Sequence, residues 1–191
     1  MTLPKLPFNW VDLLILVVFV RILYIGRKQG FVIESLKLIS VVIATYIGLH
    51  YYNILGHFFH ERLFFPEIFK DIFAFVLLIV LTTLLLMLIR TGFLFLFKIE
   101  PHPILNQVGS LVLAALRAYV IYGLLASSFI LFNYDYLKKS MEKSMTYILL
   151  ENPSVGIYKF LHEGLVNKFS PQEINKDALR KLSGYKIISK K

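Results

Sequence analysis

The chain contains no cysteine and few charged residues, and each shortage excludes a class of function. Without cysteine there is no disulfide scaffold, thiolate zinc site, iron–sulfur cluster or cysteine nucleophile. Charged residues make up 17% of the 191 positions, against about 25% in a soluble domain, and 57% of the residues are hydrophobic. This balance is typical of a chain dissolved in a bilayer, and the length suits one domain.

The motifs of common catalytic sites are absent as well. The sequence has no glycine-rich phosphate loop, no nucleophile elbow and no His-Glu-x-x-His pair. Ser127 and Ser128 lie in an apolar stretch without an obvious base. We therefore expect a protein that is not an enzyme and that carries no cofactor.

Four apolar stretches are each long enough to cross a bilayer core of about 30 Å. The clearest begins at Ile72 and holds 18 consecutive uncharged residues before Arg90. It has no polar face, which argues against a soluble helical bundle. No small-residue cleavage site follows the first stretch, so we expect it to be retained. The predicted fold is all-α and polytopic, a membrane domain over 1–133 with spans at about 8–26, 31–52, 72–97 and 104–132. An aromatic loop over Asn53–Asp71 is expected between the second and third spans.

Residues 134–191 are expected to form a basic tail of short amphipathic helices. Of the 21 lysines and arginines, 11 lie after residue 133. The pattern predicts helices over Asp135–Leu150 and Ser154–Lys168, and a third from a capping box at Ser170–Glu173 to about Leu182. These helices are too charged to span, so we expect them at the interface or over one end of the bundle. The net charge of +9 then points to anionic lipid headgroups rather than to nucleic acid.

Charged residues inside the apolar spans are the candidate functional residues. An unpaired charge at mid-bilayer costs about 2.5–3.5 kcal/mol on insertion scales, so each needs a partner, water or a route to the headgroups. A long side chain near the end of a span can extend to the headgroups. This explanation fits Lys37 well and Arg117 least. The intramembrane candidates are Asp12, Arg21, Glu34, Arg90 and Arg117.

The first two spans are expected to form a helical hairpin. Gly26 and Gly30 predict a tight turn between them. In an antiparallel hairpin closed by that turn, Arg21 and Glu34 lie at the same depth, about one and a half turns from it. The sequence therefore predicts an Arg21–Glu34 ion pair between the two helices.

Small residues recur along one face of the fourth span, at Ser110, Ala114 and Ala118. A stripe with this spacing lets another helix approach closely. Arg117 neighbours the stripe, so we expect it to face protein or a wet cavity rather than lipid. A structural clasp and a solute site are both compatible with this placement.

Three histidines lie near one helical face, at His50, His57 and His60. Zinc binding is one interpretation, and interfacial histidines in an aromatic loop are the other. Because no firm ligand set accompanies them, we expect no metal site, and the sequence alone leaves the choice open.

Three stretches of the sequence form a recognisable pattern: Asn9-Trp10-Val11-Asp12, the run from Gly26 through Gly30-Phe31 to Glu34, and Asn106-x-x-Gly109 leading to Arg117. In these stretches the chain resembles the colicin V production protein family. The resemblance covers about residues 8–135. It implies a bacterial inner-membrane protein connected with colicin V production or export and with envelope physiology. Leu113 and Ala118 stand where the family often has glycine, and the tail is longer than usual.

Two functions are compatible with these features. In the first, the intramembrane charges line a polar path in a transport or export component, which needs an oligomer or a membrane partner because one chain has few helices. In the second, the charges are clasped pairwise in a non-catalytic scaffold whose tail binds lipid or a partner. Basic residues near Arg27 favour a cytoplasmic first turn, whereas Lys138, Lys139 and Lys143 favour a cytoplasmic tail. We favour the first orientation because the hairpin inserts first.

Overall fold

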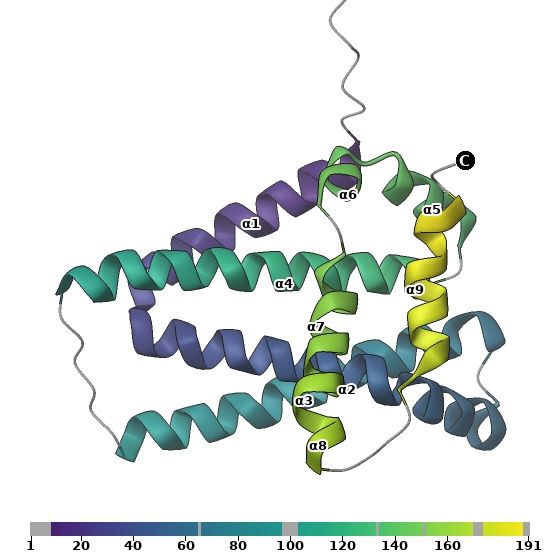
Figure 1. Ribbon diagram of the computed structural model, residues 1–191, viewed down its shortest axis with the longest axis horizontal. Coiled ribbons are helices and arrows are strands. Elements are labelled where there is room, and N and C mark those ends of the chain that lie inside the picture. The colour runs from purple at the N-terminus through teal and green to yellow at the C-terminus, as the bar shows by residue number, and fades with distance from the viewer. Residues whose placement is uncertain are drawn as a thin grey trace, which may run out of the picture.

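The computed structural model describes residues 9–64, 66–96, 103–132, 134–150, 152–169 and 174–188, and within these ranges the chain is helical without a β-strand. The long helices run roughly along one direction (Figure 1). They are α1 (Trp10–Gln29), α2 (Phe31–Leu63), α3 (Glu67–Leu96) and α4 (Ser110–Leu131), the last preceded by a π-helical turn, η1 (Leu105–Gly109). The tail contains α5 (Asp135–Glu142), α6 (Met145–Leu149), α7 (Pro153–Leu161), η2 (His162–Val166), α8 (Asn167–Phe169) and α9 (Lys176–Ile188).

The spatial order of the long helices differs from their order in the chain. Helix α4 packs against both α1 and α2, and α3 packs against α2, so α4 lies between the first two helices (Figure 1). The crossing of α1 and α4 is close, because a Cβ atom placed on Gly26 would overlap the Cβ of Ala114. Small side chains at this crossing let the two backbones approach. Consequently α1 and α2 do not form the packed hairpin that the sequence predicts.

The packed antiparallel hairpin is instead formed by α2 and α3. The loop expected over Asn53–Asp71 is wrong, because α2 continues to Leu63 and α3 begins at Glu67. Aromatic side chains from the expected loop pack between the two helices, with the rings of Phe59 and Phe73 5.3 Å apart. Helix α2 ends where Phe64 adopts a left-handed conformation and donates its N–H to the carbonyl of Phe59.

Three of the helices are long and apolar enough to cross a membrane, over Phe31–Arg62, Phe69–Leu96 and Asn106–Leu131. Helix α1 falls short of this description because its 20 residues include Asp12, Arg21, Arg27 and Lys28. The described part of the chain therefore has an all-α, membrane-type architecture with three clear candidate spans rather than clearly four.

The tail folds back onto the long helices. Helix α7 crosses α2 and α4, and α9 lies beside it (Figure 1). The single helix predicted over Asp135–Leu150 is divided into α5 and α6, and α7, η2 and α8 occupy the second predicted helix. The capping box at Ser170–Glu173 lies outside the described residues, and the third tail helix, α9, continues past Leu182 to Ile188.

Candidate functional site

Glu34 is the centre of a buried charge cluster between α2 and α4. Its side chain is 0% exposed, one turn into α2. Lys37, three residues later on the same helix, donates a hydrogen bond from Nζ to Glu34 Oε1 at 3.1 Å. From α4, a terminal guanidinium nitrogen of Arg117 lies 3.2 Å from Glu34 Oε2, and the Arg117 side chain is 10% exposed. A carboxylate buried this deeply requires such partners, because desolvation of an isolated charge is costly.

The close helix crossing also covers Glu34. A Cβ atom on Gly26 would lie 3.5 Å from the Glu34 carboxyl carbon, as well as overlapping Ala114. Gly26 therefore places α1 over the cluster, where a larger residue would force the helices apart.

Arg90 on α3 adds a third cation. It is half-buried and acts electrostatically on both Lys37 and Arg117. Among the described residues Lys37 and Arg117 contact the Glu34 carboxylate and Arg90 acts on both of them, so three cations accompany one carboxylate and leave an excess of positive charge in apolar surroundings. The Nε atom of Arg117 is buried and has no hydrogen-bond partner among these residues. Such an arrangement attracts an anion, because a buried donor left unsatisfied is unfavourable.

The predicted ion pair between Arg21 and Glu34 is wrong. Arg21 is exposed on α1, whereas Glu34 is fully buried against Lys37 and Arg117. The prediction assumed that consecutive helices pack together, but α4 lies between them. The spacing of Glu34 and Lys37, three residues apart on one helix, was the sequence signal for the observed pair.

The expected Gly26–Gly30 turn is also shorter than predicted. Gly26 lies within α1, and only Gly30 leaves the helical conformation, with φ of 85°. The backbone N–H of Phe31 donates to the side-chain oxygen of Asn106 at 2.8 Å. A Cβ on Gly30 would collide with that side chain. Asn106, on η1, thus caps the start of α2 and ties the connection between α1 and α2 to the turn that precedes α4.

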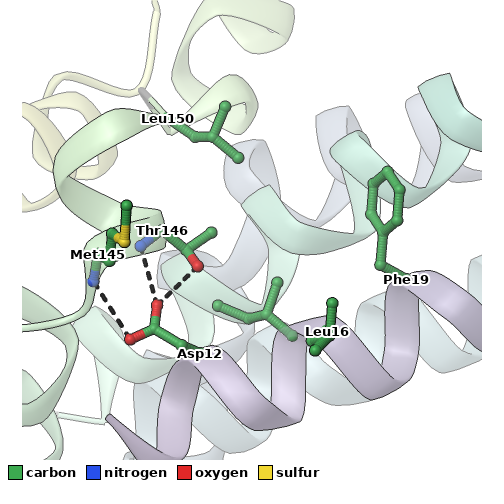
Figure 2. Close-up of a pocket in the computed structure, with 7 residues that line it drawn as sticks. Asp12, Leu16, Phe19, Met145, Thr146 and Leu150 are labelled. Atoms are coloured by element: carbon green, nitrogen blue, oxygen red, sulfur yellow. Dashed lines mark hydrogen bonds between the residues drawn. The ribbon is translucent and has the colours of Figure 1, made fainter. Parts of the chain in front are cut away.

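Asp12 connects the start of α1 to the tail rather than to the charge cluster (Figure 2). It is 4% exposed and completes a capping box with Asn9. Its two oxygens accept hydrogen bonds from the Ser144 hydroxyl at 2.6 Å, the Thr146 hydroxyl at 2.7 Å, and the backbone N–H groups of Thr146 and Met145 at 2.9 and 3.2 Å. Since both oxygens are occupied, Asp12 acts as a clasp. The same contacts explain why the chain turns between α5 and α6.

Two cavities open beside these elements. One, of about 370 Å³, lies between α1 and α6 next to the Asp12 clasp, and apolar side chains such as Leu16, Phe19 and Leu150 line most of it (Figure 2). The other, of about 330 Å³, lies between α2, α3 and α4.

The small-residue stripe of α4 is buried at Ser110, Ala114 and Ala118. Ala114 and Ala118 pack against Ile22 of α1. The stripe therefore lies on the face of α4 that α1 covers.

The histidines do not gather at one place. His50 faces the tail, where its Nδ1 lies 2.9 Å from the Tyr158 hydroxyl, whereas His57 is exposed. The described residues contain no group of three or more His, Cys, Asp and Glu side chains that could hold a metal ion.

Residues that the sequence did not single out dock the tail on α2. Asn175 donates from its side chain to the carbonyls of Leu49 and His50 and from its backbone N–H to Tyr158. His162 of η2 lies 3.3 Å from the Tyr46 hydroxyl. Burial raises the pKa of Tyr158, so this hydroxyl stays neutral. This contact could not be predicted, because single amide and hydroxyl side chains far apart in the sequence follow no periodic pattern.

Comparison with known sequences gives one family. The family model described as "Colicin V production protein" matches residues 11–154, which run from the second residue of α1 through α2, α3 and α4 to the start of α7. No curated protein and no solved structure matches the chain significantly.

Proposed function

Because this chain belongs to the colicin V production protein family, we propose that it is a multi-pass protein of the bacterial inner membrane that takes part in colicin or toxin production or export and in envelope homeostasis. Its role is that of a non-catalytic transport component, without a cofactor. The bilayer and either further copies of the chain or another membrane protein are its partners, since the described helices are too few to enclose a wide path.

In this proposal α1 is a fourth span. Its outer face carries exposed apolar side chains, including Leu13, Leu16, Val17, Val20 and Tyr24. Asp12 is buried and its carboxylate is hydrogen-bonded by donors of the tail, and Arg21 is long enough to reach the headgroups. These features favour contact of α1 with lipid over contact with water.

The observation that supports transport is the excess positive charge around Glu34. The Asp12 carboxylate has hydrogen-bond donors at both oxygens, whereas the three cations Lys37, Arg90 and Arg117 outnumber the single carboxylate of Glu34, so the cluster carries a net positive charge. Intramembrane charges that are not balanced typically mark an ion or substrate path.

The test is secretion of colicin V by a producing strain that lacks this chain, complemented with single variants. Arg90→Gln should lower secretion, because it removes one cation of the cluster. The level of membrane-inserted protein should stay unchanged, because the ion pairs of Glu34 among the described residues are with Lys37 and Arg117. Arg21→Gln, an exposed arginine outside the cluster, is the matched control and should secrete normally. Normal secretion by Arg90→Gln would reject the transport role.

A second candidate is a scaffold whose tail binds a partner, and the Asp12 clasp favours it. The clasp holds α6 against the start of α1, which presents the tail helices in a defined position. Under this function Asp12→Asn, which weakens the clasp, should reduce secretion more than Arg90→Gln does.

A further inference from the structure

The cavity between α2, α3 and α4 is an apolar groove whose lining begins one helical turn beyond Lys37 on α2 and one turn beyond Arg117 on α4. Its volume is about 330 Å³, and only Thr83 and Ser128 bring polar side chains to it. The remaining lining residues are Val41, Ala44, Val76, Ile79, Val80, Ile121, Leu124 and Leu125.

Each cation of the cluster lies on the groove-facing side of its own helix. Residues spaced by four or seven positions share one face of a helix, and four residues correspond to about 6 Å along its axis. On α2 and α4 the groove residues follow the cation, and on α3, which runs the opposite way, they precede it. The groove therefore extends from the cluster in the same direction along all three helices, away from the Gly30 end of the bundle. The residues concerned are Lys37, Val41 and Ala44 on α2, Val76, Thr83 and Arg90 on α3, and Arg117, Ile121 and Leu124 on α4.

A positive cluster beside an apolar groove is complementary to an anionic lipid, which has a negative headgroup and an apolar chain. We propose that this site binds one anionic phospholipid, with its phosphate among Lys37, Arg90 and Arg117 and an acyl chain in the groove between α2, α3 and α4. Arginine side chains are suited to phosphate, and the buried Nε of Arg117 still lacks a partner among the described residues. The phosphate would offset the positive charge that Glu34 does not balance.

The groove argues for a lipid rather than for a free anion, because an anion alone leaves the apolar space empty. Inside a membrane, however, an acyl chain gains little free energy by entering an apolar groove, since the surrounding lipid tails are equally apolar. Selectivity for this lipid must therefore come from the cations, and the groove selects for a ligand that has a chain. This binding site is independent of the proposed function, since a transport component and a scaffold could both hold such a lipid.

The experiment is native mass spectrometry of the full chain purified in detergent, titrated with phosphatidylglycerol or with phosphatidylcholine of identical chains. The wild type should retain phosphatidylglycerol preferentially. Arg90→Gln should reduce this preference roughly fivefold, the effect of one basic residue near an anionic lipid surface. Arg21→Gln, outside the cluster, should retain it. Equal retention of the two lipids by the wild type, or an unchanged preference in Arg90→Gln, would overturn the proposal.

The groove is tested separately on α3. Val80 lines it and is 47% exposed, whereas Leu85 lies on the opposite face of the same helix and is 59% exposed. Val80→Trp should displace phosphatidylglycerol and Leu85→Trp should not, with helical content by circular dichroism unchanged in both. If Val80→Trp misfolds, Ile121→Phe fills the groove from α4. Undiminished lipid binding in a folded groove variant, or full competition by inorganic phosphate, would show a headgroup-only anion site and reject the lipid.

Discussion

The carboxylate of Glu34 on α2 lies 3.2 Å from the guanidinium of Arg117 on α4, with both side chains closed off from solvent. The two residues come from the second and fourth long helices, and Lys37 completes the contact from the turn after Glu34. The pair thus fixes how α4 lies against α2, and Gly26 of α1 covers it.

Glu34→Ala should destabilise the protein by about 3–5 kcal/mol, because it leaves buried cations without their carboxylate. The measurement is denaturant unfolding in detergent, followed by circular dichroism. Arg21→Ala serves as the control and should change stability by less than about 0.5 kcal/mol, as expected for an exposed side chain. If Arg21→Ala lowered the stability as much as Glu34→Ala does, Arg21 rather than Arg117 would be the partner of Glu34.

Gly26→Ala should destabilise by about 1–3 kcal/mol, because its methyl group overlaps Ala114 and separates α1 from α4. The double variant with Ala114→Gly should recover much of this loss, since it makes room at the same crossing. Gly156, where a Cβ meets nothing within 4 Å, provides a matched glycine-to-alanine control. Simple additivity of the two single changes would mean that the residues do not touch.

Asp12→Ala should release the tail from the start of α1. Its removal leaves the Ser144 and Thr146 donors without their acceptor, at a cost of about 1–3 kcal/mol for each buried group left unpaired. Hydrogen exchange of the backbone amides of Met145 and Thr146 should then accelerate, while amides in α3 remain protected. Unchanged exchange at these two amides would contradict the clasp.

Asn175→Ala should loosen α9 while leaving the long helices intact. The side chain of Asn175 binds two carbonyls of α2 and accepts from the N–H of Ala178, so its loss removes both the docking contact and a helix cap. Limited proteolysis should cleave the variant within α9 faster than the wild type. Asn167→Ala, at an exposed position in α8, should leave the rate unchanged.

The start of α1 and the tail are predicted to lie outside the cytoplasm, with the Gly30 connection inside. Arg27 and Lys28 lie beside the short Gly30 connection, which belongs to the first pair of helices to insert, and basic residues in a short connection favour the cytoplasm. A phosphatase fused to the C-terminus should be active, and a fusion after Leu96 should be inactive. A C-terminal reporter that works only in the cytoplasm would reverse this orientation.

The sequence alone was sufficient for the class of protein and for most helices. The uncharged run from Ile72 to Ile89 indicates an apolar helix under any packing, since hydrophobicity along the chain reports the solvent. The sequence also carries the motifs of the family, and the family model matches residues 11–154. The end of α2 was predicted too early, because charged residues are interspersed among the aromatic residues from Asn53 onward. Only the packing of these aromatic residues on α3 shows that the segment is helical.

The partners of the buried charges were decided by the tertiary structure. Depth along a helix can be counted from the sequence, which is how Arg21 and Glu34 were placed at one level, but depth does not specify which helix stands beside which. The neighbours of each helix depend on the close approach of α1 and α4 at Gly26 and Ala114. This approach brings α4 between α1 and α2, so that Glu34 pairs with Arg117. The same holds for Asp12, whose donors lie more than 130 positions away, because a hydrogen bond of that range leaves no periodic trace in the chain.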